Sequence, residues 1–259
     1  MSIYQHFRKH EHQFVDQVLS WKEQVERTYT SYITDFLDPR ERKIIESLIG
    51  SSNEDVQYAF FGGADHTERQ RAIIAPFYET IEEDHFKLVL LEASFPKKFV
   101  TIQHRDILGT FISEGLDRKK IGDIFVRDDA FQIVTTEELA SFIMLNIDKI
   151  KNASVQLKEV PRNTIFPSDD EWMEQTSTVS SLRLDVLIKE MYNMSRKDAS
   201  LLIQGERVKV NFTVVNDPAF LVEVDDLLSV RGHGRGKIIS IDGVTRKEKV
   251  RITTAKLKM

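Results

Sequence analysis

Hydrophobic residues in the first fifty positions recur at three- and four-residue spacings, a pattern that predicts helices with one apolar face. The first apolar stripe consists of Phe14, Val15, Val18, Trp21 and Val25. A second helix is expected to begin after Asp38, which can cap it, with Pro39 at the first helical position, and to end at Gly50. The two segments together predict a helical hairpin.

Short runs of β-branched and aromatic residues replace this pattern from Val56 onward. Strands are expected at 58–61, 71–75, 86–91, 123–126, 131–134 and 155–160, and helices at 105–115 and 137–149. This order predicts a mixed α/β unit in which a sheet carries helices on one face. Residues 161–181 contain two prolines and a Ser/Thr cluster with little periodicity, which is typical of a linker.

The last third of the chain begins with another helical pattern, formed by Leu184, Leu187, Ile188 and Met191. Ser195 with Asp198 three residues later is a capping signature, so a second helix is expected from Ser195 to about Gly205. Lys209 then stands between two valines, as in a strand with one exposed face, and further strands are expected at 221–224 and 227–230. This region therefore predicts two helices followed by a small antiparallel sheet.

These elements predict an α+β protein with four parts. We expect a mainly helical amino-terminal domain at 1–75, a central α/β domain at 76–165, a linker at 166–180, and a carboxy-terminal domain with a basic tail at 181–259.

Composition narrows the chemistry that the chain can perform. With 41% apolar residues the 259-residue chain can bury a sizeable core, and the absence of cysteine excludes disulfides and thiolate metal sites. No apolar run approaches the roughly 18 residues of a membrane span, and the first residues lack the apolar core of a signal peptide. We therefore expect a soluble, cytoplasmic protein with no membrane contact.

Charge is distributed unevenly along the chain, whose net charge is −5. From Arg183 to the end there are 15 Lys/Arg against 10 Asp/Glu, whereas the preceding residues have 21 against 31. Between Arg231 and Lys258 nine basic residues face only two acidic ones. Such a local surplus attracts a phosphate backbone, so the carboxy-terminal region is the candidate nucleic-acid interface.

Two segments of this region carry candidate phosphate contacts. Arg196 and Lys197 follow the capping Ser195 and would lie beside the free N–H groups of a helix start. Further on, glycines alternate with cations in the run Arg231, Gly232, His233, Gly234, Arg235, Gly236, Lys237. Glycine lets the backbone approach a phosphate while the long side chains reach sideways. This run is no nucleotide-binding loop, because its spacing is wrong and no Ser/Thr follows Lys237.

Plainer interpretations of these residues remain open. The cations can form a solvated surface, and Arg183 and Asp185 can form an internal pair that stabilises the fold. Glycines 62 and 63 favour a tight turn over a ligand loop, histidines 6, 10 and 12 favour a solvated helix face over a metal site, and aromatics 60, 61, 77 and 78 favour burial over base stacking. We identify no catalytic constellation, no metal site and no cofactor site, and expect no enzyme activity.

The carboxy-terminal residues resemble the RNA-binding domain named after small-subunit ribosomal protein S-four. Its signature is matched by Arg183-Leu184-Asp185, Ser195-Arg196, Ala199, Leu202-Ile203 and Val208-Lys209-Val210-Asn211. Two positions depart from it: Glu206 stands in place of the usual glycine before the first strand, and Phe212 replaces the glycine of an Asn-Gly turn. Charge pattern and resemblance together give the expected RNA-binding residues: Arg183, Ser195, Arg196, Lys197, Lys209, Asn211, Arg231, Gly232, His233, Arg235 and Lys237.

Motifs in the front half extend this resemblance to the YlmH-type proteins. They are the Phe36–Glu41 segment, Phe61-Gly62-Gly63, and Glu68-Arg69, beside the glycine-basic run. The resemblance implies a central domain similar to an RNA-recognition fold and a role in ribosome-associated quality control. The expected partners are rRNA and tRNA on large ribosomal subunits obstructed by peptidyl-tRNA, and other quality control factors, with no small-molecule cofactor. Two alternatives are an RNA-modifying enzyme guided by its S-four domain and a cell-division scaffold.

Overall fold

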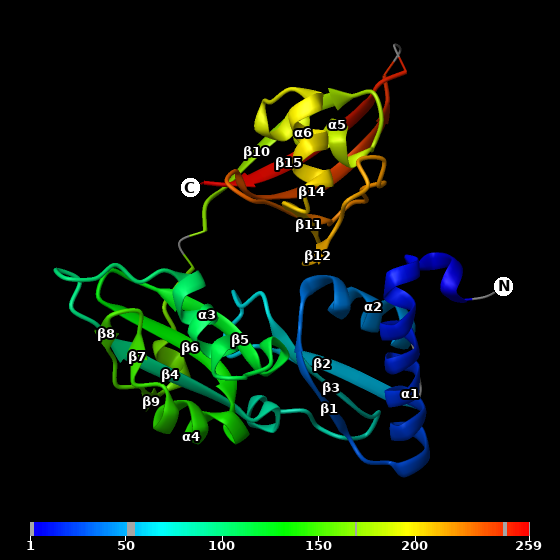
Figure 1. Ribbon diagram of the computed structural model, residues 1–259. Coiled ribbons are helices and arrows are strands. Elements are labelled where there is room, and N and C mark those ends of the chain that lie inside the picture. The colour runs from blue at the N-terminus through cyan, green and yellow to red at the C-terminus, as the bar shows by residue number, and fades with distance from the viewer. Residues whose placement is uncertain (1–2, 51–54, 169, 246–247, 259) are drawn as a thin grey trace. The chain divides into compact units, whose positions relative to one another are not determined.

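The computed structural model describes residues 3–50, 55–168, 170–245 and 248–258. The chain forms two compact units, Met1–Ser168 and Asp169–Met259, called here the amino-terminal and carboxy-terminal units (Figure 1). Each combines helices with antiparallel sheets, which confirms the predicted α+β class. Arg246 and Lys247, two of the nine cations between Arg231 and Lys258, lie outside the described residues.

The amino-terminal unit begins with two helices and a three-stranded sheet. The elements are α1 (His12–Thr28), β1 (Tyr32–Leu37), α2 (Pro39–Ile49), β2 (Val56–Phe61) and β3 (Gln70–Pro76), with the strands in the order β1-β3-β2. Asp38 caps α2 by accepting the backbone N–H groups of Arg40 and Glu41, as predicted. The expected helical hairpin is wrong, because β1 lies between the helices and pairs with β3. The first 75 residues are therefore a helix-and-sheet structure.

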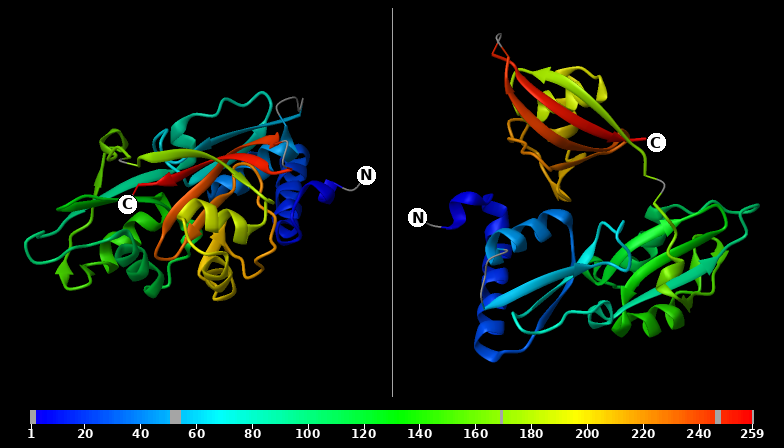
Figure 2. Two further views of the ribbon diagram at one scale, coloured as in Figure 1. Left: turned by 90° about the horizontal axis from the view of Figure 1, so that it is seen from above. Right: turned by 180° about the vertical axis from the view of Figure 1, so that it is seen from behind.

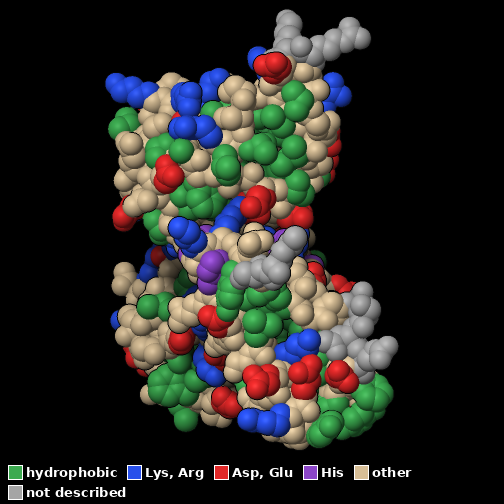
Figure 3. All heavy atoms as spheres, turned by 90° about the vertical axis from the view of Figure 1, so that its right-hand side faces the viewer, with side chains coloured by type: hydrophobic (Ala, Val, Ile, Leu, Met, Phe, Trp, Pro, Cys, Tyr) green, Lys and Arg blue, Asp and Glu red, His purple; other side chains and the backbone are tan. Residues whose placement is uncertain are grey.

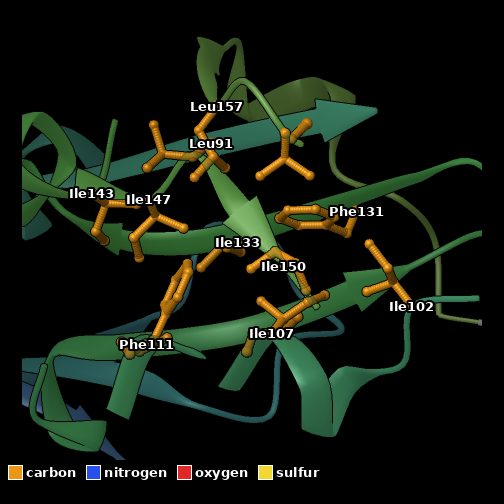
Figure 4. Packing of buried hydrophobic residues seen from close by; sticks show 14 of the residues in the cluster. Leu91, Ile102, Ile107, Phe111, Phe131, Ile133, Ile143, Ile147, Ile150 and Leu157 are labelled. Carbon is orange, nitrogen blue, oxygen red and sulfur yellow. The ribbon is translucent and has the colours of Figure 1, made fainter. Parts of the chain in front are cut away.

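The second part of this unit is a four-stranded sheet with two helices on one face. The elements are β4 (Leu88–Ser94), α3 (His104–Ser113), β5 (Ile121–Val126), β6 (Ala130–Thr136), α4 (Glu137–Asn146), and the short strands β7 (Lys149–Ile150), β8 (Ala153–Ser154) and β9 (Lys158–Val160). The sheet order β5-β6-β4-β9 puts the first and third strands in the middle, as in ferredoxin-like and RNA-recognition folds. Figure 4 shows the core between this sheet and its helices, to which Leu91, Phe111 and Phe131 belong. Short 3-10 helices lie at Ile3–His6, Lys9–Glu11, Glu83–Phe86, Arg118–Lys120 and Arg162–Thr164.

The two sheets of the amino-terminal unit bury a face against each other. One hydrophobic cluster joins Phe36 and Ile73 of the first sheet to Leu88, Leu90 and Val134 of the second. Contact is close, since a Cβ added at position 122 on β5 would lie 2.7 Å from the ring of Phe36. The helix α1 covers the opposite face of the first sheet through Val18, Trp21 and Val25. The two sheets of the amino-terminal unit are therefore joined by a shared hydrophobic cluster.

The carboxy-terminal unit is a six-stranded antiparallel sheet covered on one face by two helices (Figure 2). Its elements are β10 (Trp172–Val179), α5 (Leu184–Tyr192), α6 (Arg196–Gln204), β11 (Val208–Val210), β12 (Thr213–Val214), β13 (Leu227–Val230), β14 (Gly234–Val244) and β15 (Val250–Leu257), with the strands in the order β10-β15-β14-β13-β11-β12. The predicted helices and the strands at 208–210 and 227–230 are confirmed. The strand expected at 221–224 is reduced to one bridge between Leu221 and Arg183.

Two segments of this unit differ from the sequence-based expectation. Half of the expected linker is the strand β10, which pairs along its whole length with β15. The segment expected to be a basic tail is instead part of the sheet, where β14 and β15 are interior strands. The strand β10 owes its conformation to pairing with β15 across a long sequence separation, which local composition does not reveal.

Candidate RNA interface

A buried carboxylate at the start of α5 holds two arginines. Arg183 donates from Nε and Nη2 to Asp185 at 3.0 and 3.1 Å, and Arg196 at the start of α6 donates from Nε at 2.9 Å. Asp185 is 2% exposed, whereas the Arg196 side chain is 55% exposed. Both interpretations of Arg183 therefore have a structural basis: it forms the internal pair, and one guanidinium nitrogen stays outside it.

The electrostatics of Asp185 favour its charged form. Burial acts to raise the pKa of Asp185, but the hydrogen bonds from Arg183 and Arg196 outweigh it and leave the pKa below its usual value. The same contact raises the pKa of Arg183. Two guanidinium groups are thus held in one orientation, with N–H groups left over for an anion.

The start of α6 is capped within the chain. The Oγ atom of Ser195 accepts the backbone N–H of Asp198 at 3.1 Å and donates to its carboxylate at 2.7 Å, so the predicted cap is confirmed. The Ser195 hydroxyl is consequently engaged inside the helix. Lys197 is exposed and, within the described residues, has no hydrogen-bond or ion-pair partner. Of the residues at this helix start, Lys197 is therefore the side chain most available to a ligand.

The glycine-basic run forms the turn between β13 and β14 and the first residues of β14. Gly232 and Gly234 have φ values of +86° and +90°, which favour glycine. Gly236 packs against α5, where an added Cβ would lie 2.4 Å from Met191. Turn geometry and helix packing thus account for these glycines without a phosphate.

The end of α5 supports this turn. The hydroxyl of Tyr192 donates to the Gly234 carbonyl at 3.3 Å, its ring lies 5.9 Å from that of His233, and burial raises its pKa to about 12. Arg231 and His233 are exposed on the turn. The backbone N–H of Arg231 donates to the carbonyl of Arg207, an exposed cation that sequence reasoning did not select. Arg207 lies on the loop between α6 and β11, where no hydrophobic periodicity in the sequence marks it.

Strand alternation sends three predicted residues to the other side of the sheet. Val208, Val210 and Gly236 face α5 and α6 in β11 and β14, so Lys209, Arg235 and Lys237 point away from the helices. Lys209 and Arg235 lie in line across this face, because both pair with Ser229. The predicted set is therefore divided: Arg183, Arg196 and Lys197 belong to the helices, and Lys209, Arg235 and Lys237 belong to the sheet face opposite them.

Asn211 has a role inside the unit. Its Oδ1 accepts the backbone N–H of Leu227 at 2.9 Å, and its Nδ2 donates to Asp226 at 2.6 Å. With Phe212 it forms the two-residue turn between β11 and β12, and both have positive φ, +47° and +66°. Glu206, the other departure from the S-four pattern, also has a positive φ of +55°. At these three positions a left-handed backbone is thus adopted by residues other than glycine.

On the side of the molecule that Figure 3 shows, Lys and Arg side chains lie over the upper part of the carboxy-terminal unit. No helix among the described residues has the length and apolar composition needed to cross a membrane. Among the same residues no group of three His, Asp or Glu side chains lies close enough to hold a metal ion.

The front-half motifs stabilise the amino-terminal unit. The backbone N–H groups of Glu68 and Arg69 donate to the half-buried carboxylate of Asp123, and Arg69 also donates to the carbonyl of Phe36 at 2.9 Å. Burial raises the pKa of Asp123, although these backbone hydrogen bonds oppose the shift. At position 62 an added Cβ would lie 2.3 Å from Thr67, so this glycine is required by a close turn. These motifs join the first sheet to the second.

The central sheet presents no stacking surface of the kind that RNA-recognition domains use. Its face away from α3 and α4 is covered by Phe36 and Ile73 of the first sheet. Phe61 packs against Phe86 in this interface, as the burial interpretation predicted. The burial interpretation is wrong for Phe77 and Tyr78, which are exposed because they follow β3 and lie outside the central sheet. The topology is that of an RNA-recognition fold, whereas this face is a hydrophobic core.

Comparison with known proteins gives matches along the whole chain. The family described as "YlmH, N-terminal" matches residues 10–79, "Putative RNA-binding domain in YlmH" matches 81–164, and the S4 (S-four) domain matches 182–228. The chain is 41% identical to "Ribosome-associated protein quality control protein P2" of Bacillus subtilis (strain 168) over 252 residues, which cover 97% of each chain. A solved structure, "Cell division protein ylmH from Streptococcus pneumoniae", is 29% identical with a TM-score of 0.54, and the match covers 62% of this chain and 98% of that one. The protein belongs to the YlmH family.

Proposed function

We propose that this protein is an RNA-binding factor of ribosome-associated quality control, acting in the cytoplasm. Its ligands are rRNA and tRNA on large ribosomal subunits that still carry peptidyl-tRNA, and other quality control factors act beside it. The full-length similarity to a ribosome-associated quality control protein supports this assignment. According to this proposal, the protein binds RNA and does not modify it chemically.

The observation that carries the proposal is the arrangement around Asp185. An arginine pair fixed by a buried carboxylate loses little conformational entropy when it binds a phosphate, and its fork geometry suits phosphate oxygens. Lys197 adds a cation without an internal partner in the described chain. This combination at the starts of two helices is suited to a structured RNA backbone.

The test is co-sedimentation of the full chain with obstructed large subunits, comparing the wild type with the Arg196→Ala/Lys197→Ala variant. We expect affinity to fall about tenfold or more, because a hydrogen bond to a charged group contributes roughly 1.5–3 kcal/mol and 1.4 kcal/mol is a factor of ten. The slope of log affinity against log salt should flatten by about 0.9 per lost phosphate contact, the value for B-DNA.

Two further variants make the result decisive. Lys197→Glu changes a side chain without an internal partner in the described chain, so its effect does not depend on the fold. Lys97→Ala/Lys98→Ala removes the same charge from an exposed loop of the amino-terminal unit and should leave binding unchanged. If Lys197→Glu and the double variant both sediment with the subunits like the wild type, the assignment of these residues is refuted.

The similarity to a Streptococcus pneumoniae structure named as a cell division protein favours a second candidate, a scaffold in cell division. Partners of such a scaffold would be captured by Met1–Ser168, which forms a compact unit. Retained capture after deletion of residues 169–259 would support this candidate, and loss of capture would leave the RNA-binding role.

A further inference from the structure

Aromatic rings accompany the cations on the sheet face that points away from α5 and α6, called here the outer face. The Nζ atom of Lys237 lies 4.4 Å from the centre of the Trp172 ring. The guanidinium carbon of Arg235 lies 6.0 Å from the centre of the Phe212 ring. Two cation–aromatic pairs therefore lie on neighbouring parts of one face.

Strand register places Trp172 on this face. Val179, seven residues further along β10, belongs to the core under the helices, and β10 pairs with β15 without a register shift. Side chains an odd number of positions apart in a strand point to opposite faces, so Trp172 points away from the helices. Trp172 pairs with Leu257, two residues from Ala255, the partner of Lys237. The contact between Trp172 on β10 and Lys237 on β14 thus reaches across β15, which lies between these two strands.

Phe212 is held on its turn at an energetic cost. An L-residue with left-handed φ is disfavoured by roughly 1–2 kcal/mol, and glycine would remove this cost. The Phe212 ring is half-buried and lies beside Arg235. A strained aromatic residue at an exposed hairpin is the kind of outlier that points to a function.

We propose that the outer face binds single-stranded RNA, with bases stacking on Trp172 and Phe212 and phosphates contacting Lys209, Arg235 and Lys237. Aromatic rings next to cations are the composition of single-strand binding surfaces, because the bases of a single strand can unstack onto a ring and those of a duplex cannot. The described charges of this face, Lys209, Arg235, Lys237 and Arg251 against Glu174 and Asp242, leave it cationic. The proposal rests on the proposed function for RNA as the ligand, but it uses a different face from Arg196 and Lys197.

The test uses a Trp21→Phe background of the full chain, which leaves Trp172 as the only tryptophan. Trp21 packs within the amino-terminal unit, stacked on Tyr32, so this change does not touch the outer face. The probe is a twelve-nucleotide oligouridine, which has no stable secondary structure. Saturating oligouridine should quench Trp172 fluorescence, and equal concentrations of a stem-loop with a short, closed loop should quench it far less.

Affinity measurements then assign the contacts. Trp172→Leu, measured by anisotropy of labelled oligouridine, should weaken binding about tenfold, since stacking on one aromatic side chain contributes roughly 1–3 kcal/mol per base. Lys237→Gln should weaken it and flatten its salt dependence. Lys256→Gln is the matched control, because Lys256 pairs with Gly236 and so points to the helix side of the sheet.

Each outcome decides between the two surfaces. Absence of quenching, or unchanged affinity in both Trp172→Leu and Lys237→Gln, overturns the outer-face site while leaving the proposed function standing. If these variants no longer bind a protein partner but keep their affinity for oligouridine, the outer face binds protein, and the outer-face RNA site is also overturned. The Lys197→Glu variant should still show quenching by oligouridine, so failure of the helix-side assignment remains distinguishable from failure of this one.

Discussion

Two sheets of this protein each carry a pair of helices on one face, and they differ in what lies on the other. In the central sheet, the face away from the helices is covered by the β1-β3-β2 sheet, through Phe36 and Ile73. The opposite face of the carboxy-terminal sheet is covered by no described element of its own unit (Figures 1 and 2). Strand alternation places Lys209, Arg235 and Lys237 on this face. The comparison shows that sheet topology does not locate a binding surface, whereas the side chains on the face do.

Polar residues complete the covering of the central sheet. Gln132 on β6 is fully buried and donates to Glu92 and to the carbonyl of Thr164, while its Oε1 accepts the backbone N–H of Phe166. The segment that leads out of the amino-terminal unit thus lies over the part of the face that the first sheet does not cover. A base could reach this face only after these hydrogen bonds and the sheet-to-sheet core were broken.

The largest effect is expected from an acidic residue in the covered face. Val134→Asp would place an unpaired charge at a position that is 1% exposed, and should lower the free energy of unfolding of the amino-terminal unit by about 4 kcal/mol. Ser229→Asp, on the outer face between Lys209 and Arg235, should change the stability of its unit by less than about 0.5 kcal/mol. Urea unfolding combined with hydrogen exchange resolved by peptide measures both.

The same pair of variants should have the reverse order of effects on oligouridine binding. Ser229→Asp brings a negative charge next to two phosphate contacts and should weaken binding, whereas Val134→Asp acts only through folding. Equal stability losses in the two variants would contradict the distinction between a covered and an uncovered face.

The sequence predicts well those elements whose pattern is local. The stripe of α1, the Asp38 cap of α2 and the Ser195 cap of α6 are predictable, because each depends on residues within one or two turns of a helix. The strands β1, β10, β14 and β15 are not. The partners of β10 are about eighty residues away in β15, and only that pairing distinguishes the strand from a linker.

The site shows the same division. Spacing identifies Arg183, Arg196 and Lys197 as residues that lie at the starts of helices. Which cations share a face depends on strand register across β11, β13 and β14, which one sequence does not supply. Sequence reasoning misses Trp172 because its surroundings have linker composition, although an isolated tryptophan in a polar segment is the one available signal.

A smaller effect is expected at Asp185, which contrasts with Asp123 of the amino-terminal unit. Asp185→Asn should lower the unfolding free energy of the carboxy-terminal unit by about 2 kcal/mol at neutral pH. This is less than for a fully buried pair, because the two arginines are partly exposed and screened by solvent. Chemical unfolding of the wild type and the variant across pH 2–7 checks the prediction.

The pH trend distinguishes the two carboxylates. The pKa of Asp185 is lowered by its arginines against the effect of burial, so its stabilisation is complete above the usual pKa of Asp, about 3.9, and is lost as the pH falls through the folded value. The pKa of Asp123 is raised by burial, so its contribution is complete below the usual value and is lost as the pH rises through the folded one. A difference between wild type and Asp185→Asn that grows on acidification would contradict the arginine-held carboxylate.

The smallest effect concerns Phe212, where stability and binding should change in opposite directions. Phe212→Gly relieves a φ of +66° but adds freedom to the unfolded chain, so the net gain in unfolding free energy should be about 0.5–1 kcal/mol. Affinity for oligouridine should fall several-fold, because a stacking ring is removed. Gly232→Ala, at a turn with φ of +86°, is the matched control and should lose stability. A Phe212→Gly variant that is more stable and binds oligouridine as well as the wild type would show that the aromatic ring at this hairpin has no part in the outer face.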